Sequence, residues 1–181
     1  PDMVGEEQSP ARAVVRTAAV RPDGGIVVVA DLQGDTQVGD TVLEGDESLD
    51  DAFSAVIALD ADGEVEWSRQ GEPFFSVAFD PAGNVLLGSE QGSLALDAAG
   101  DEIWSSVEGG SFTIGADGGT YLFNGRMWGD DMDGLLSKLA PDGELVWQTR
   151  LDDSTLDFGG LLAVDESGRA TVVTYCGGNV D

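Results

Sequence analysis

A four-residue pattern that ends in glycine recurs seven times along the chain, and it constrains the fold more than any other feature of the sequence. Its copies are "RPDG" (21–24), "DADG" (60–63), "DPAG" (80–83), "DAAG" (97–100), "GADG" (115–118), "APDG" (140–143) and "DESG" (165–168). Proline at the second position suits a type I turn, and the invariant glycine suits a following residue with positive φ. The pattern therefore predicts seven β-hairpins, each with a bulged turn.

Aspartate stands at the first position of several of these turns, where its carboxylate can accept a hydrogen bond from the backbone two residues further on. The residues are Asp60, Asp80, Asp97 and Asp165. Taken alone, the acidic stretch "ALDADGEVEW" (58–67) would also fit a metal-binding loop. Its recurrence in sister turns favours the interpretation that these aspartates brace a bend.

Two kinds of hairpin alternate along the chain. After Gly24, Gly83, Gly118 and Gly168 come mostly unbroken apolar runs, which are typical of strands buried on both faces. After Gly63, Gly100 and Gly143 come more polar segments, each with tryptophan four residues past the glycine. We therefore expect inner strands in the first kind and outer strands in the second, with Trp67, Trp104 and Trp147 packing between neighbouring units.

An inner hairpin followed by an outer hairpin makes a four-stranded antiparallel unit, which is the pattern of a β-propeller blade. The predicted fold class is all-β, with about three and a half propeller-type blades in this chain. A polar N-terminal segment, 1–13, precedes one repeat domain, 14–181. Its expected blades are at about 14–69, 73–106 and 111–150, with a half blade at 158–181.

A family resemblance rests on "ALDADGEVEW" (58–67), "LALDAAGDEIW" (94–104) and "SKLAPDGELVW" (137–147). These repeats resemble the PQQ-like repeat of quinoprotein-type propellers, and equally the seven-bladed-propeller repeat of bacterial surface and secreted proteins. The resemblance implies a propeller fold and a secreted, periplasmic or cell-surface location in a bacterium. Because such propellers close with about six to eight blades, it also implies a partial propeller or fragment, closed by further blades of the same or another chain.

Charge and composition exclude several classes of function. Acidic residues number 35 against 8 basic ones, for a net charge of −27, which repels nucleic acid and anionic lipid. No apolar run is long enough to suggest membrane insertion. With no histidine, the chain cannot form a Ser-His-Asp triad or a histidine-ligated metal site, and the single Cys176 is expected to be a small core or strand-end residue.

Acidic segments occupy the long connections that a propeller would gather on the face opposite the glycine turns. They are "EGDESLDD" (44–51), "GDDMDG" (129–134) and "LDDSTLD" (151–157). Calcium takes six to eight oxygen ligands, and such loops are rich in carboxylates. The candidate calcium ligands are Asp130, Asp131 and Asp133, with a solvated acidic rim as the alternative.

Trp128 lies outside the repeat pattern, in a predicted connection beside Arg126 and the acidic residues. An aromatic side chain next to polar groups is typical of a binding surface, although ordinary loop packing is the alternative. The predicted partner-binding residues are Trp128, Arg126, Asp50, Asp51, Asp152 and Asp153.

These features favour a non-catalytic binding or scaffold module that recognises a protein or carbohydrate partner through acidic rim loops. Two alternatives stay open. One is an enzyme domain, either quinoprotein-like or based on a pair of carboxylates. The other is a calcium-binding propeller that acts in adhesion or as a lectin.

Overall fold

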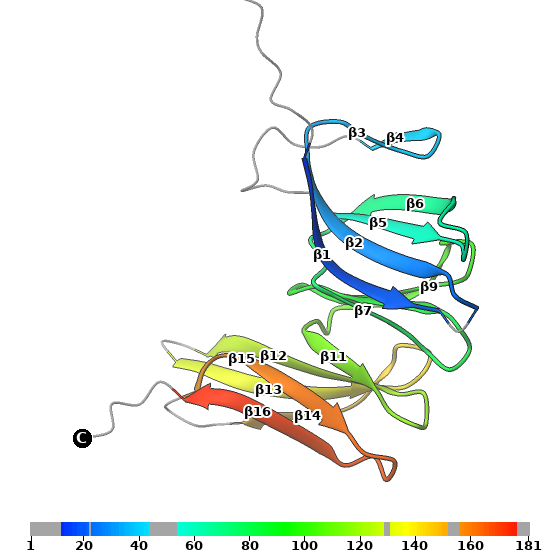
Figure 1. Cartoon of the computed structure of the whole chain (residues 1–181). Coiled ribbons are helices and arrows are strands. Elements are labelled where there is room, and N and C mark those ends of the chain that lie inside the picture. The colour runs from blue at the N-terminus through cyan, green and yellow to red at the C-terminus, as the bar shows by residue number, and fades with distance from the viewer. Residues whose placement is uncertain (1–11, 22, 44–53, 129–130, 152–155, 177–181) are drawn as a thin grey trace, which may run out of the picture.

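The computed structural model describes residues 12–21, 23–43, 54–128, 131–151 and 156–176, and Figure 1 shows their arrangement. For 126–128, 131–133, 156–160 and 174–176 the description concerns the backbone alone. The regular elements in these ranges are β-strands, and no helix in them is long and apolar enough to cross a membrane. The predicted all-β fold class is confirmed.

Three four-stranded antiparallel sheets follow one another within the described residues, and we call them blades one, two and three. Blade one contains β1 (Arg12–Val20), β2 (Ile26–Gln33), β5 (Ser54–Leu59) and β6 (Val65–Gly71). Blade two contains β7 (Ser76–Phe79), β8 (Val85–Gly88), β9 (Ser93–Leu96) and β10 (Glu102–Ser106). Blade three contains β11 (Ser111–Ile114), β12 (Thr120–Trp128), β13 (Asp131–Leu139) and β14 (Leu145–Leu151).

Two further hairpins complete the described chain. β15 (Leu156–Val164) and β16 (Ala170–Cys176) pair with each other and follow blade three. β3 (Thr36–Val38) and β4 (Thr41–Leu43) form a small separate hairpin between β2 and β5, which the sequence pattern did not predict.

The first strands of successive blades lie side by side, as the innermost strands of a propeller do. β1 contacts β7, β7 contacts β11, and β11 contacts β15. Each complete blade then runs outward in chain order to β6, β10 or β14 (Figure 1). The strand order and the neighbouring first strands together define a partial β-propeller.

Apolar residues of the second and third strands, with Phe74 from the connection between β6 and β7, form the main core, which lies between blades one and two. The cluster contains Val27, Val29, Val56, Ala58, Phe74, Val85, Leu87, Leu94 and Leu96. Trp67 of the outer strand β6 packs against it. Burial of β2, β8 and the first part of β12 confirms the predicted inner strands, because a neighbouring blade covers each of them.

The prediction that the strand after Gly168 is buried on both faces is wrong. That strand is β16, and its Val173 is 57% exposed. The apolar run is present, but no described strand or blade covers this side of β16, so its side chains reach solvent.

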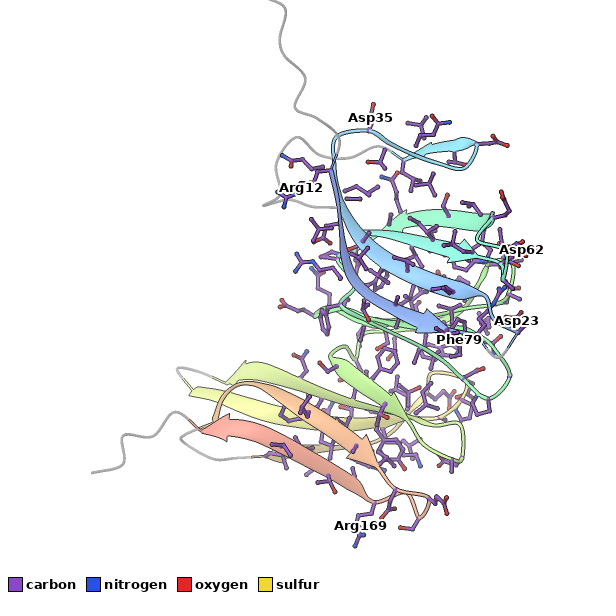
Figure 2. The ribbon with its side chains drawn as sticks, in the orientation of Figure 1. Arg12, Asp23, Asp35, Asp62, Phe79 and Arg169 are labelled. Carbon is purple, nitrogen blue, oxygen red and sulfur yellow. The ribbon has the colours of Figure 1, made fainter. Side chains whose placement is uncertain are left out.

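All seven predicted turns have the expected bulged geometry. Their glycines have φ between 77° and 94°. In the turn 60–63 the N–H of Gly63 donates to the carbonyl of Asp60 at 3.1 Å, and the N–H of Asp60 donates to the carbonyl of Glu64 at 2.9 Å. The other six turns repeat this pair of bonds. Figure 2 shows Asp23 and Asp62, from two turns of blade one, at the opposite end of the blade from Arg12.

A carboxylate braces every one of these turns. The Oδ1 of Asp60 accepts from the N–H groups of Asp62 and Glu64, both at 2.9 Å, and Asp80, Asp97 and Asp165 act in the same way. Turns that lack a first-position aspartate use the third position instead: Asp23, Asp117 and Asp142 accept the N–H of the residue after the glycine. The predicted bracing role is confirmed, and it explains the acidic turns without a metal ion.

The tryptophans of β6 and β10 dock on the outer turn of the next blade. The indole Nε1 of Trp67 donates to the carbonyl of Ala98, and that of Trp104 donates to the carbonyl of Pro141, each at 3.0 Å. Both acceptors are second residues of a glycine turn. The predicted packing between neighbouring blades is confirmed for these two side chains.

One turn carboxylate should make the stability of the protein depend on pH. The hydrogen bond from the Lys138 ammonium at 2.5 Å, together with the N–H of Gly119, lowers the pKa of Asp117 below its ordinary 3.8. A lowered pKa stabilises the fold above the unfolded-state pKa, and this contribution is lost as the pH falls through the folded-state pKa. Asp117→Asn should therefore lower the urea midpoint at neutral pH, and the gap to the unmodified protein should close below about pH 4.

The control for this experiment is Asp62→Asn, which removes the same charge from a turn already braced by Asp60. It should leave the urea midpoint nearly unchanged. A destabilisation by Asp117→Asn of equal size at every pH would contradict the role assigned to the ionised carboxylate.

Candidate functional site

Two adjoining hollows open between blades one and two, and we call them together the interblade groove. They measure about 400 and 270 Å³ and share Glu72, Phe74 and Gln91 in their linings. The shared residues lie on the connections from β6 to β7 and from β8 to β9. The groove therefore opens on the face opposite the glycine turns, where the sequence predicted recognition.

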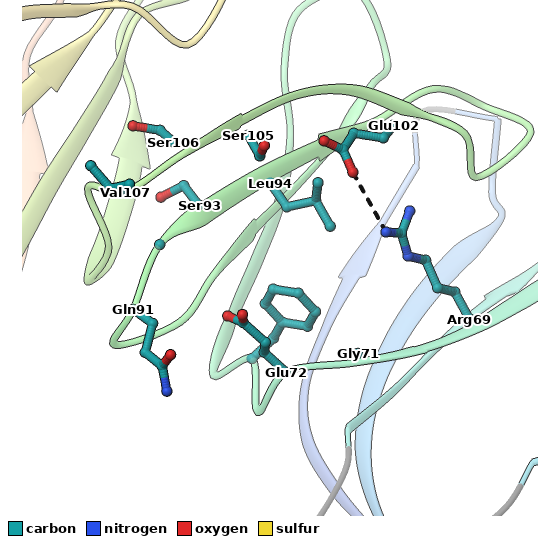
Figure 3. A pocket seen from close by; sticks show the side chains of 12 residues that line it. Arg69, Gly71, Glu72, Gln91, Ser93, Leu94, Glu102, Ser105, Ser106 and Val107 are labelled. Carbon is teal, nitrogen blue, oxygen red and sulfur yellow. Dashed lines mark ion pairs between the residues drawn. The ribbon is translucent and has the colours of Figure 1, made fainter.

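The larger hollow is polar along its sides (Figure 3). Arg69 of β6 faces Glu102 of β10, with 3.6 Å between Nη2 and Oε2. Both side chains are partly exposed, so this ion pair adds little to stability and can exchange its partners for a ligand. Ser93, Ser105 and Ser106 add hydroxyl groups to the lining, and Leu94 and Phe74 add apolar surface.

The smaller hollow combines a buried carboxylate with an exposed aromatic ring. Asp31 is 3% exposed and accepts hydrogen bonds from Arg16 Nε and from Ser54 Oγ, the latter at 3.1 Å. Phe75 is 38% exposed and lines the same hollow with Glu72 and Glu90. Asp31 thus holds Arg16 in place, while Glu72, Glu90 and the ring of Phe75 face solvent.

The loop between β8 and β9 is held in one shape by its own hydrogen bonds. Ser89 Oγ accepts the N–H of Gln91 at 3.2 Å and of Gly92 at 3.0 Å. The carbonyl of Ser89 accepts the N–H of Gly110 at 2.8 Å, from the connection to β11. A β-carbon on Gly109 would lie 2.3 Å from that carbonyl, so the close approach of the two connections needs glycine there. Gln91 and Glu90 are therefore presented on a rigid loop.

The groove is suited to holding a positively charged group. Four carboxylates line it, from Asp31, Glu72, Glu90 and Glu102, against the two guanidinium groups of Arg16 and Arg69. The whole chain carries a net charge of −27, which strengthens the negative potential in a concave site. An ammonium or guanidinium group could pair with a carboxylate there and lie against the ring of Phe75.

The described part of the predicted site lies at the end of the β12–β13 hairpin. Asp50, Asp51, Asp130, Asp152 and Asp153 fall outside the described residues. Arg126 and Trp128 end β12, and Asp131 and Asp133 begin β13. Trp128 pairs with Asp131, and Arg126 with Asp133, across this hairpin.

The prediction that Arg126 and Trp128 lie in a connecting loop is wrong. The two strands are in register along their whole length, so the backbone pairing of β12 and β13 continues to Trp128 and Asp131. The calcium site and the partner-binding surface predicted here stay predictions. Among the side chains that the structure describes, no three acidic or cysteine residues gather as a metal site.

Sequence reasoning missed the groove residues. Glu72, Phe74 and Phe75 come from "GEPFFS" (71–76), which joins blade one to blade two. Two aromatic residues beside an acidic one, in a connection between blades, were a usable signal. Gln91 and Arg69 carried no signal of their own, because only the packing of the two blades brings them to one groove.

The fold and the groove together define a partial β-propeller with an acidic, solvent-open groove between its first two blades. The chain is similar to a protein of unknown function from Bacteroides caccae, with 14% identity and a TM-score of 0.50, over 91% of this chain and 72% of that one. This likeness supports the fold alone. BamB from Moraxella catarrhalis has 14% identity and a TM-score of 0.31, over 88% and 82% of the two chains, which is too low to carry an argument. No family model and no curated protein matches the chain.

Proposed function

We propose that this chain is a non-catalytic binding module that recognises a basic segment of a partner protein through the interblade groove. The observation that carries the proposal is the smaller hollow, where Glu72 and Glu90 stand beside the exposed ring of Phe75. A lysine or arginine side chain would gain an ion pair and a cation–π contact in the same place.

The groove and the overall charge would act at different stages of binding. The net charge of −27 steers a basic partner toward the protein and raises the association rate at low salt. Phe75 and the neighbouring carboxylates of Glu72 and Glu90 then retain one cationic side chain, since short-range contacts are screened less by salt than distant charges are. The rigid loop 89–92 limits the entropy lost on binding.

Several predictions from the sequence remain proposals beside this one. One is that Asp130, Asp131 and Asp133 bind calcium, which calcium titration by calorimetry would test. Another is that the protein is secreted, periplasmic or located at the cell surface. Further blades, from the same or another chain, are proposed to continue the propeller beyond β16 and before β1.

Glu72→Gln should weaken binding of a lysine decapeptide by about two- to fivefold, because it removes one exposed carboxylate from the groove. Calorimetry at low and physiological salt would measure the affinity. The matched control is Asp62→Asn, which removes the same charge from a turn on the opposite face and should change the affinity little. Phe75→Ala should also weaken binding.

Equal losses from Glu72→Gln and Asp62→Asn would show that the peptide senses net charge alone, and the groove proposal would then fail. Equal binding of a glutamate decapeptide would also contradict it. Binding of a neutral oligosaccharide that Phe75→Ala abolishes would favour the carbohydrate partner instead.

A further inference from the structure

Trp147 is the third tryptophan of the repeat, and among the described residues no turn is docked on it. It follows Gly143 by four residues on β14, as Trp67 and Trp104 follow their glycines on β6 and β10. Its side chain meets Tyr121 edge-on, with 6.0 Å between ring centroids, and remains 37% exposed. Within the described part of the chain its indole N–H has no acceptor, unlike those of Trp67 and Trp104.

A hollow of about 250 Å³ lies next to Trp147. Its lining includes Tyr121 and Lys138 from blade three and the turn residues 166–168 between β15 and β16. Tyr121 Oη donates to the carbonyl of Gly168 at 3.3 Å, and the Lys138 ammonium lies over the Tyr121 ring, 4.8 Å from its centroid. These contacts fix the walls of the hollow and leave its space open.

The equivalent space between blades two and three is filled by the outer turn 140–143. There Pro141 accepts the hydrogen bond of Trp104 and lies with its Cγ 3.6 Å from where a β-carbon of Gly118 would be. A β-carbon on Gly143 would lie 2.6 Å from the Trp104 ring, so the ring packs directly on the glycine. Gly168 corresponds to Gly118, so the hollow matches the place of one more such turn.

The edge of β16 that is unpaired within the described residues is a second, independent indication that an outer hairpin docks here. In each complete blade the second strand pairs with a third, as β2 with β5, β8 with β9, and β12 with β13. β16 holds the position of a second strand, yet within the described residues it pairs with β15 only. A row of unpaired backbone groups at a strand edge can accept another strand.

We infer that Trp147, the hollow beside it and the edge of β16 form a docking site for the outer β-hairpin that completes the blade begun by β15 and β16. The hairpin would place its third strand along β16, a small residue or proline under the Trp147 N–H, and a glycine against the indole ring. This inference rests on the proposal that further blades continue the propeller, and it is independent of the interblade groove.

A second copy of this chain does not fit the site. Its turns 97–100 and 140–143 are already covered by Trp67 and Trp104. Among the described residues nothing covers Gly63 of its turn 60–63, but the strand that leads into this turn, β5, is hydrogen-bonded on both edges, to β2 and β6. No edge of that strand remains to pair with β16, so the occupant is an outer hairpin from beyond the described residues, of the same or another chain, and not one that a second copy supplies.

The test is a synthetic hairpin of residues 93–106, closed by a disulfide in place of Ser93 and Ser106, which face each other across β9 and β10. It is added to the ¹⁵N-labelled full chain, and the indole N–H signals of the tryptophans are followed by NMR. The Trp147 signal is assigned as the one that is missing from the spectrum of Trp147→Phe. On addition of the hairpin the Trp147 signal should shift and become protected from solvent exchange, while the signals of Trp67 and Trp104 stay in place.

Two variants sharpen this experiment. Trp147→Ala should weaken hairpin binding by about tenfold or more, and Trp147→Phe should weaken it less, because a six-membered aromatic ring is kept while the pyrrole ring and its N–H donor are lost. A hairpin with Gly100→Val should also bind at least about tenfold more weakly, since its side chain would meet the indole ring.

The outcomes separate this inference from the proposal on which it rests. Hairpin binding with an unmoved Trp147 signal would overturn the docking site and leave further blades possible elsewhere. No binding at any concentration would count against both. Protection of Trp147 that grows with protein concentration, without the hairpin, would identify a second copy as the occupant and overturn the inference.

Discussion

Gly143→Ala should lower the free energy of unfolding by about 2–5 kcal/mol. Gly143 has φ of 84°, where a β-carbon costs about 1–2 kcal/mol. The added carbon would also lie 2.6 Å from the Cδ2 and Cε3 atoms of Trp104, and such overpacking costs about 1–3 kcal/mol more. The Trp104 ring would have to move, and its 3.0 Å hydrogen bond to Pro141 would break or lengthen.

Gly63→Ala is the matched control for this substitution. Gly63 occupies the same place in its turn and has φ of 86°, but among the described residues nothing lies within 4 Å of its β-carbon position. Gly63→Ala should therefore lower the free energy of unfolding only by the cost of a β-carbon at positive φ, about 1–2 kcal/mol. Urea unfolding of both variants gives the difference, and equal losses would show that the tryptophan contact does not constrain the glycine.

Leu87→Ala should destabilise the protein by about 2–5 kcal/mol. Leu87 lies on β8, is fully buried, and belongs to the core cluster between blades one and two. Truncation removes apolar contacts and leaves a cavity, because strands hydrogen-bonded on both sides cannot move inward to fill it. Because the interblade groove depends on the same packing, lysine-peptide binding should weaken together with stability.

The control for the core variant is Leu161→Ala on β15. The chemical change is the same, but Leu161 is 72% exposed, so the expected loss is about 0.5 kcal/mol or less. Thermal and urea unfolding would measure both variants. A loss at Leu161 as large as that at Leu87 would indicate that residue 161 is covered in solution, as a further blade docked on β15 and β16 would require.

The turns were predictable because their conformation is decided within five residues. Gly63 supplies the positive φ, and Asp60 satisfies two nearby N–H groups, whatever the rest of the chain does. The alternation of apolar and polar hairpins then gave the order of strands in each blade. Both inferences rest on recurrence, because one turn conformation has to fit all seven copies of the pattern.

Other features depended on distant partners and were missed or mistaken. The apolar composition of β16 predicted burial, but burial needs a covering strand, and the described residues contain none there. The segment around Trp128 was predicted to be a connection because it lies outside the repeat pattern, yet the pairing of β12 with β13 continues to Trp128 and Asp131. Arg69 and Gln91 meet in one groove only through the packing of two blades.

By itself, the sequence determined the local chemistry of this protein: seven braced turns, their alternation, and the strongly acidic charge. These depend on interactions between residues close in the chain, or on composition alone. The tertiary structure alone decided that Glu72, Glu90 and Phe75 share a hollow, and that Trp147 has no covering turn among the described residues, whereas Trp67 and Trp104 each have one. Both depend on which blade stands next to which, a relation between residues that no local pattern encodes.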